Sequence, residues 1–124
     1  MNNPKMIADY FMEDMRHHRV EVFKGAFFDA KCNFIGSETV AKGSLSFAYV
    51  SPAELFRKAL LKNAVMIVIL HNHPSGDPTP SREDLELTQQ IARGAQLLGI
   101  TLADHIVIGD NRYYSFRENH RLET

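Results

Sequence analysis

The stretch Val65-Met-Ile-Val-Ile-Leu-His-Asn-His-Pro-Ser-Gly76 decides the fold of this chain. It begins with an apolar run, residues 65–70, that is apolar at odd and even positions alike and rich in β-branched side chains. That pattern is typical of a central strand covered on both faces. The next residues, HNHPSGDPTP over 71–80, contain three prolines and a glycine, which predict a loop. We therefore expect a buried strand that leads into a loop carrying His71 and His73.

Helices and further strands are predicted around this central strand. Ser51-Pro-Ala-Glu54 has the form of a capping box and opens a helix, and Gly99 is a natural stop for a helix over 82–98. An N-terminal helix is expected over 4–17, and strands over 20–29, 34–40, 100–108 and 112–116. This order predicts an α/β fold, a single-domain sandwich around a mixed, partly antiparallel β-sheet flanked by helices.

The length and composition limit what the chain can be. Its 124 residues suffice for one domain, with an N-terminal helix over 1–19, the domain proper over 20–116 and a polar, frayed tail over 117–124. The 14 basic residues nearly balance the 15 acidic ones, so we expect no strong nucleic-acid binding by this domain alone. A single cysteine, Cys32, excludes an intramolecular disulfide and zinc sites built from several cysteines.

The sequence shows neither a signal-peptide pattern at its N-terminus nor an apolar run of membrane length. The N-terminal residues lack the basic and then apolar pattern of a signal peptide. The longest apolar run, residues 64–70, is much shorter than the roughly 20 residues that a membrane helix needs. We therefore expect a cytoplasmic, soluble domain that makes no membrane contact, and the sequence carries no signal for its oligomeric state.

The candidate metal ligands are His71, His73 and Asp84. Residues two apart in an extended backbone point the same way, and Asp84 lies one turn into the following helix, within reach of the same point. Two histidines and a carboxylate leave a fourth position for water, which is the layout of catalytic zinc sites. The alternative is an ordinary turn-rich loop in which Ser81 and Asp84 only form a capping box. The spacing alone leaves both interpretations open.

A family resemblance favours the metal site. The string His71-x-His73-x7-Ser81-x2-Asp84 matches the motif H-x-H-x7-S-x2-D of the JAMM, or MPN+, metalloproteases in every required position. The longer strings HNHPSGDPTPS, EDLELT, DHIVIGD and YYSF resemble the RadC-like JAB branch of that superfamily of zinc metalloproteins, over about residues 20–116. The resemblance implies a JAMM/MPN-like domain with Zn²⁺ held by these two histidines and the aspartate.

The JAMM pattern also needs an upstream glutamate, for which Glu21 is the first candidate. Glu21 fits the E-x-F opening of the RadC-like branch, and strand parity places it on one face with Phe23 and Phe27. A carboxylate among apolar neighbours is costly unless a metal, a water or a donor meets it. Glu38 is the rival, although it is equally explained as a solvated edge residue, and Glu54 is explained as a helix cap.

The resemblance also implies a mechanism. Zinc would lower the pKa of a bound water toward about 7, and Glu21 would act as the general base. Ser81 would donate a hydrogen bond to the oxyanion. The substrate would be a peptide or isopeptide bond on a protein or peptide with an extended tail, bound by strand addition at a sheet edge.

Other interpretations compete with a zinc-dependent metallohydrolase. The chain could be a zinc-binding interaction module of the RadC-like family, loosely associated with DNA repair, without peptidase turnover. An HNH nuclease is disfavoured, because its motif residues are spread over a ββα finger and those at 71–73 are consecutive. Asp104 and His105 fall inside an expected strand, where a histidine is more often a hydrogen-bonded structural residue than a partner of a metal ligand.

Overall fold

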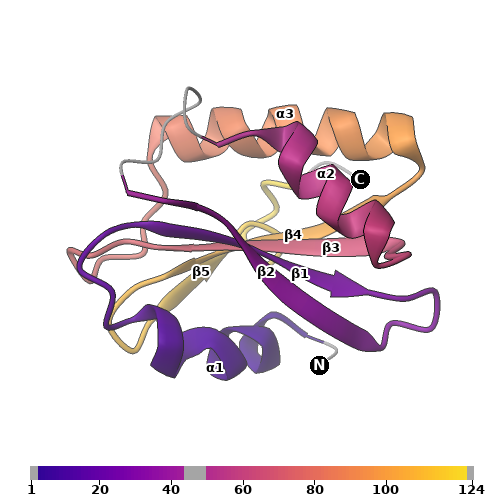
Figure 1. Cartoon of the computed structure of the whole chain (residues 1–124). Coiled ribbons are helices and arrows are strands. Elements are labelled where there is room, and N and C mark those ends of the chain that lie inside the picture. Colours follow the sequence, from indigo (N-terminus) through magenta and orange to yellow (C-terminus); the bar gives the residue numbers. More distant parts are fainter. Residues whose placement is uncertain (1–2, 44–49, 123–124) are drawn as a thin grey trace.

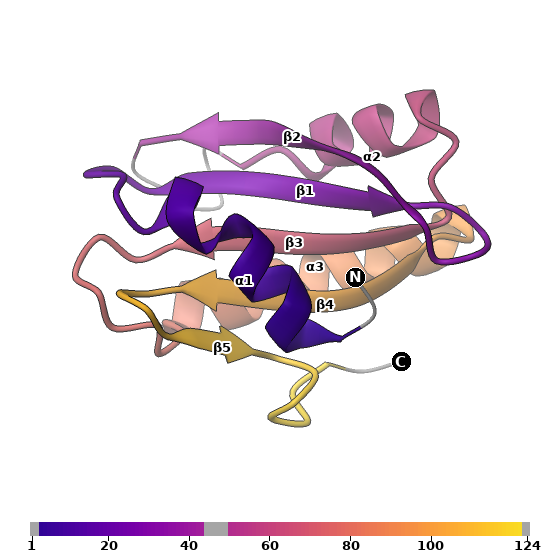
Figure 2. The same ribbon diagram turned by 90° about the horizontal axis from the view of Figure 1, so that it is seen from below.

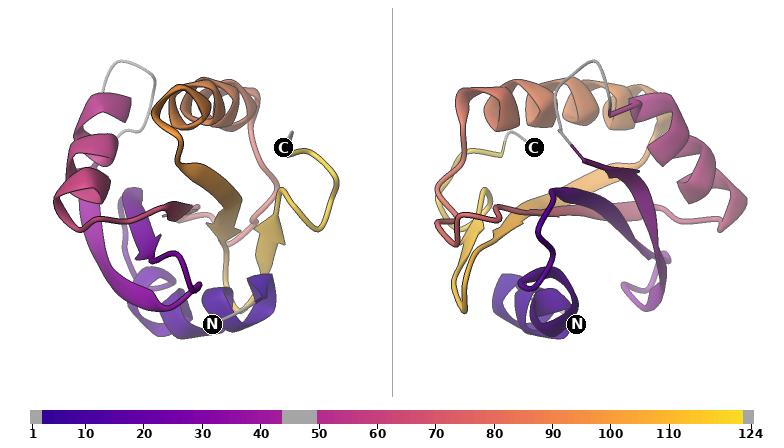
Figure 3. Two further views of the ribbon diagram at one scale, coloured as in Figure 1. Left: turned by 90° about the vertical axis from the view of Figure 1, so that its right-hand side faces the viewer. Right: turned by 60° about the vertical axis from the view of Figure 1, so that its left-hand side comes forward.

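A five-stranded sheet lies between two layers of helices in the computed structural model, which describes residues 3–43 and 50–122 (Figure 1). Helices α2 and α3 cover one face of the sheet, and α1 crosses the other, as Figures 2 and 3 show from two further directions. The elements in chain order are α1 (Pro4–Met15), β1 (Val22–Phe28), β2 (Phe34–Lys42), α2 (Pro52–Leu61), β3 (Met66–Asn72), α3 (Arg82–Leu98), β4 (Thr101–Ile108) and β5 (Tyr113–Ser115).

The sheet is mixed, as the sequence predicts. Its strand order is β2-β1-β3-β4-β5, in which β3 and β4 run parallel and the other neighbouring pairs run antiparallel. Two parallel strands need a crossover connection, and α3 supplies it. The loop between β3 and α3, residues 73–81, therefore lies at the carboxyl end of the central strand.

The central strand β3 is covered on both faces. Ile67 and Ile69 belong to the cluster under α2 and α3, whereas Val68 and Leu70 belong to the cluster under α1. This confirms the prediction from the uninterrupted apolar run. The strand continues two residues beyond that run, to Asn72, so the extended backbone that the metal-site argument needs reaches through His71.

The N-terminal helix is a layer of the domain and not only a lead into it. The Asn3 side chain caps α1 by accepting from the Met6 amide at 2.9 Å. The predicted stripe of Ile7, Phe11 and Met15 is buried against the sheet. The helix ends at Met15, two residues before the expected end, where the chain turns toward β1.

The C-terminal tail makes contacts with the domain over its described part, residues 117–122. The Arg121 amide donates to the Phe116 carbonyl, and Leu122 packs against the cluster under α2 and α3. Residues 123–124 lie outside the described part of the chain. Among the described residues, no helix combines the length and the apolar character that spanning a membrane requires.

Candidate metal centre

The three predicted ligands meet at the carboxyl end of β3. His71 is the second-last residue of this strand and is 2% exposed, and His73 follows the strand directly. Asp84 is the third residue of α3, after the N-cap Ser81. The loop of prolines and glycine between them returns the chain to the sheet, so that side chains from a strand, a loop and a helix face one point.

The ligand atoms lie close together. His71 Nε2 is 3.1 Å from one Asp84 carboxylate oxygen, and His73 Nε2 is 3.1 Å from the other. The two Nε2 atoms are 3.0 Å apart. Ligand atoms about 2 Å from a tetrahedral zinc lie roughly 3.3 Å from one another, so these separations suit a tetrahedral cation.

The hydrogen bonds around the two rings and the carboxylate also fit a metal. His73 Nδ1 lies 2.9 Å from the Asp77 carbonyl. A carbonyl oxygen only accepts, so this Nδ1 carries the hydrogen, and in the neutral ring Nε2 carries the lone pair. His71 likewise turns Nδ1 away from the centre, toward His105 at 2.8 Å, and its Nε2 inward. Two lone pairs and a carboxylate that point to one place would repel one another without a cation between them. This arrangement therefore fits a bound divalent cation better than a cluster held by hydrogen bonds alone.

Asp84 has the geometry of both a helix-capping residue and a metal ligand, the two roles that the sequence left open. Ser81 Oγ accepts from the Asp84 amide at 3.1 Å, and the Ser81 amide donates to the Asp84 carboxylate at 2.7 Å, which completes the predicted capping box. The same carboxylate faces both histidines. The capping box and the ligand geometry therefore do not compete, because the cap fixes the carboxylate in the first turn of α3, where the helix dipole favours its negative charge.

Burial and hydrogen bonding shift the pKa values of these groups. Burial alone raises the pKa of the Asp84 carboxyl, but the closeness of the His71 and His73 rings to its two oxygens outweighs burial and holds this pKa well below its usual range. The hydrogen bond to Asp84 raises the pKa of His73. Burial lowers the pKa of His105 well below its ordinary value. The carboxylate is thus ionised, as a metal ligand must be.

Glu21 joins this group from just before β1 and is half-buried. One carboxylate oxygen of Glu21 and one ring nitrogen from each of His71 and His73 all lie within 4.8 Å of one another. The His71 ring stacks on Phe23, so the Glu21 carboxylate lies on the side of the sheet that carries Phe23. The role of Glu21 as a general base stays a prediction.

The backbone on both sides of Glu21 is held by the residue between the two histidines. Asn72 Oδ1 accepts from the Val22 amide at 2.6 Å, and Asn72 Nδ2 donates to the Val20 carbonyl at 3.1 Å. The Glu21 carbonyl accepts from the Gly43 amide at 2.8 Å. The β1–β3 ladder ends at the pair Phe23 and His71, so the Asn72 amide continues the connection past the last rung. These bonds place Glu21 beside the centre.

The rival glutamates lie elsewhere. Glu38 lies on β2 and pairs with Lys62 at 3.3 Å and Lys58 at 3.6 Å, both on α2 or just after it. Ser51 caps α2 by accepting from the Glu54 amide at 3.3 Å, and the Glu54 carboxylate pairs with Lys58 and Arg57. The capping role expected of Glu54 is therefore carried by Ser51 and the Glu54 backbone, and neither carboxylate belongs to the group around the histidines.

Asp104 and His105 are neighbours in sequence, but their side chains contact different parts of the molecule. Asp104 accepts hydrogen bonds from Ser115 Oγ at 2.5 Å and from the Arg117 amide at 3.0 Å, so it anchors the C-terminal turn. His105 contacts His71 directly. Sequence reasoning missed Thr88, which contacts His105 at 2.5 Å. Its signal was its place four residues after Asp84, on the same helix face.

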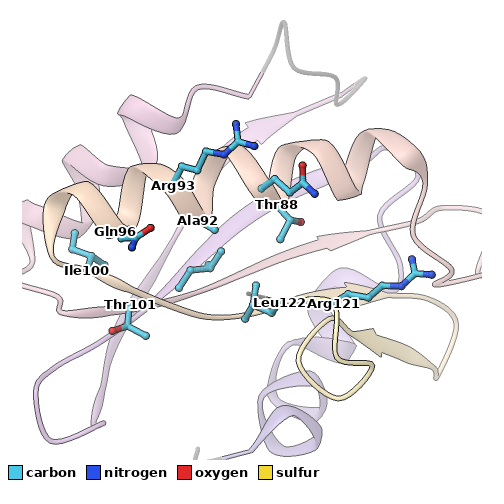
Figure 4. A pocket seen from close by; sticks show the side chains of 10 residues that line it. Thr88, Ala92, Arg93, Gln96, Ile100, Thr101, Arg121 and Leu122 are labelled. Atoms are coloured by element: carbon cyan, nitrogen blue, oxygen red, sulfur yellow. The ribbon is translucent and has the colours of Figure 1, made fainter. Parts of the chain in front are cut away.

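A cavity of about 600 Å³ lies beside this centre, between α3, the start of β4 and the C-terminal tail (Figure 4). Thr88 is on its wall, together with polar residues that include Arg93, Gln96 and Arg121. The three candidate ligands and Glu21 are not among the residues that line it. The chemistry of the centre is therefore separate from this cavity.

The chain is similar to several UPF0758 proteins. The chain is 44% identical over 118 residues to a UPF0758 protein of Desulfitobacterium hafniense, which covers 95% of this chain and 52% of the relative. It is 41% identical over 117 residues to a UPF0758 protein of Clostridioides difficile, covering 94% and 50%. It is 40% identical over 118 residues to one of Methanosarcina mazei, covering 95% and 52%. The chain thus spans about half the length of the curated relatives it matches.

The family model described as the RadC-like JAB domain matches residues 1–122, which include α1 and the folded part of the tail. This match extends beyond the residues that carry the motif and covers every element of the described fold. The chain belongs to the RadC-like JAB domain family.

Proposed function

We propose that this domain is a zinc-dependent hydrolase of peptide or isopeptide bonds. One observation carries the proposal: the Nε2 atoms of His71 and His73 and the Asp84 carboxylate lie 3.0–3.1 Å apart, with the Glu21 carboxylate alongside. These three residues would hold zinc, which would supply a Lewis acid and lower the pKa of the attacking water. Membership of the JAB family is compatible with such an activity.

Glu21 acts on the proton of the attacking water. Its carboxylate oxygen takes this proton and returns it to the nitrogen of the leaving amine. The hydrogen bonds of Asn72 to the flanking backbone support this role, because they fix the position from which the carboxylate reaches the centre. A general base must lie within hydrogen-bond reach of the proton, directly or through one water.

Ser81 stabilises the developing oxyanion. Its Oγ accepts from the Asp84 amide, which uses a lone pair and leaves the hydroxyl hydrogen to donate. Ser81 is exposed at the start of α3, on the same turn as Asp84. One donor to an oxyanion contributes about 3 kcal/mol to transition-state stabilisation in other hydrolases.

The substrate is a protein or peptide with an extended tail that adds to the edge of the sheet. β2 is an edge strand of the described sheet, and its side chains alternate between half-buried and exposed over most of its length. Gly43, directly after β2, donates to the Glu21 carbonyl. A segment paired with β2 therefore runs along the sheet toward the candidate base, and main-chain hydrogen bonds supply its affinity.

A metal titration combined with a cleavage assay tests this function. The chain is loaded with zinc and incubated with a panel of isopeptide-linked proteins and extended peptides. We expect cleavage of at least one substrate by the parent, and loss of that cleavage by about a hundredfold or more in Glu21→Gln. Glu13→Gln, in α1 on the other face of the sheet, is the matched control and should cleave as the parent does. Zinc binding without cleavage of any substrate would favour an interaction module over a hydrolase.

A further inference from the structure

A chain of hydrogen bonds connects the backbone of one candidate ligand to the ring of another. Thr88 Oγ1 donates to the Asp84 carbonyl at 2.7 Å and lies 2.5 Å from His105 Nδ1. His105 Nε2 lies 2.8 Å from His71 Nδ1. The chain crosses three elements, because Thr88 is on α3, His105 on β4 and His71 on β3.

The chemistry of these groups fixes where each hydrogen lies. The Asp84 carbonyl only accepts, so the single hydroxyl hydrogen of Thr88 points to it. Thr88 Oγ1 can then only accept from His105, and His105 Nδ1 must carry a hydrogen. In a neutral imidazole the other nitrogen is an acceptor, so His105 Nε2 accepts from His71 Nδ1. The His71 lone pair is thereby placed on Nε2, which faces Asp84 and His73.

The surroundings of His105 keep its ring in this role. The side chain is completely buried, and its ring stacks on Phe116 with a centroid distance of 4.5 Å and an interplanar angle of 11°. Phe23 meets the same ring edge-on at 6.5 Å. Thr88 is 3% exposed. Because both side chains are almost completely buried, the neutral form of the His105 ring is favoured in this site.

We infer that Thr88 and His105 are positioning residues that hold His71 in the tautomer with hydrogen on Nδ1, which directs its Nε2 lone pair to the metal. This inference rests on the proposed metal centre. It differs from an ordinary structural role, because a histidine that only fills the core affects stability and has no bearing on the tautomer of its neighbour. It assigns a function to residues outside the ligand motif, one of which, Thr88, also lines the adjacent cavity.

The first test measures the tautomers directly in the parent protein. Two-bond ¹H–¹⁵N correlation spectra of the metal-free, full chain at mildly alkaline pH report which imidazole nitrogen carries hydrogen. We expect hydrogen on Nδ1 of both His71 and His105. Hydrogen on Nε2 of His71 would overturn the inference. This measurement needs no variant, so it decides the matter even if a substitution at these positions prevents folding.

The second test measures zinc affinity by competition with a chromophoric chelator. Thr88→Val keeps the shape of the side chain and removes the hydroxyl, so we expect zinc to bind about ten- to a hundredfold more weakly, the usual effect of losing a hydrogen bond behind a ligand. Thr88→Ser restores the hydroxyl and should bind zinc as the parent does. Equal affinities of Thr88→Val and the parent would contradict the inference.

The two tests keep this inference distinct from the proposed function. A parent chain that binds no zinc overturns the proposed metal centre, whereas the spectra of the metal-free chain still show whether Thr88 and His105 set the His71 tautomer. A parent that binds zinc and cleaves nothing overturns the hydrolase and leaves the affinity comparison intact.

Discussion

The two sides of the candidate centre are held in different ways. On the ligand side, His71 and His73 are oriented by hydrogen bonds to their ring nitrogens, and Asp84 by the cap of α3. On the Glu21 side, the hydrogen bonds from Asn72 and Gly43 involve the backbone around Glu21. A metal ligand must present a lone pair in one direction, whereas a general base must only be brought within reach of a proton. Each kind of support matches what its residue has to do.

This comparison predicts that substitutions can impair the function of each side without impairing that of the other. Changes on the ligand side should lower metal affinity, and changes on the Glu21 side should lower turnover while the metal stays bound. The predictions that follow test this separation, beginning with the largest expected effect.

Removing both histidine ligands should abolish zinc binding. We expect close to one zinc per parent chain and none in the His71→Ala/His73→Ala double variant, as measured by elemental analysis after dialysis. The matched control is His17→Ala/His18→Ala, which removes two imidazoles that pair with α1 carboxylates and should keep the metal. Equal zinc content in all three proteins would rule out these ligands.

Chelation of the parent should reproduce part of this effect as a loss of stability. A ligand that binds only the folded state, at a free concentration a hundred times its dissociation constant, stabilises that state by about 2.7 kcal/mol. The midpoint of thermal unfolding should therefore fall when a chelator is added, and it should not change in the double histidine variant. The buried central strand needs no metal, so the chelated chain should still unfold cooperatively.

Glu21→Gln should separate the base from the ligands. The amide keeps the size of the side chain and loses the basic oxygen, so turnover should fall by about a hundredfold or more while zinc stays bound. Three ligands suffice to hold zinc in a catalytic site. If Glu21→Gln releases the metal, Glu21 is itself a ligand and the two sides of the centre are not distinct. If Glu38→Gln abolishes turnover instead, the base has been assigned to the wrong glutamate.

Ser81 has two proposed roles, the cap of α3 and the donor to the oxyanion, and two substitutions distinguish them. Ser81→Ala should lower the free energy of unfolding by about 1 kcal/mol through loss of the cap, and turnover by about a hundredfold through loss of the oxyanion donor. Ser81→Asp should keep the cap, since aspartate is a good N-cap residue, and should still lose turnover because its charge repels an oxyanion. Full turnover in Ser81→Asp would leave only the capping role.

Asn72→Ala should weaken the Glu21 side alone. It leaves the buried Val22 amide without its acceptor, which should lower the free energy of unfolding by about 1–3 kcal/mol. Turnover should fall while zinc content is unchanged, because the Asn72 side chain is hydrogen-bonded to the backbone on both sides of Glu21. Asn33→Ala, which removes an exposed bond to Asp29, is the control and should change neither property. Zinc loss in Asn72→Ala would show that the two sides are coupled.

The parts of this centre that could be predicted are those fixed by local rules. The apolar run of β3 and the capping box of α3 are local, and both placed His71 and Asp84 correctly because the strand parity and the helix turn are regular. The match to the JAMM motif then predicted that His71 and Asp84 belong to one metal site. Glu21 was proposed from the motif and from strand parity, and it lies beside the histidines as a half-buried residue just before β1.

The parts that could not be predicted depend on contacts between distant segments. His105 reaches His71 because β4 lies parallel to β3 in a register that no local pattern encodes, so its role was left open between a structural and a functional interpretation. Thr88 belongs to no motif of the sequence, and its contact with His105 arises only because α3 packs on β4. The tail beyond Phe116 is polar in sequence, and its return to the core depends on Asp104, which accepts a hydrogen bond from the Arg117 amide in the interior.

The smallest expected effect is a pH dependence of stability that belongs to the ligand side. Burial lowers the pKa of the His105 imidazole well below its ordinary value of 6.5 in the folded chain. As the pH falls below 6.5, the unfolded chain takes up a proton that the folded chain refuses, so the free energy of unfolding falls until the folded pKa is reached. One such proton changes this free energy by at most about 1.4 kcal/mol per pH unit. His73 acts in the opposite sense, because its hydrogen bond to Asp84 raises its pKa.

A comparison of two proteins isolates the His105 contribution from that of His73. Denaturant unfolding of the metal-free parent and of His105→Gln is measured at a series of pH values above and below 6.5, with a chelator present throughout. Because glutamine does not titrate, the parent should lose stability relative to His105→Gln as the pH falls, and the difference between the two proteins should become constant above the ordinary histidine pKa. Parallel curves would mean that His105 takes up its proton equally well in both states. The ring behind His71 would then not be held neutral by burial, and the contrast between the two sides of the centre would lose its electrostatic basis.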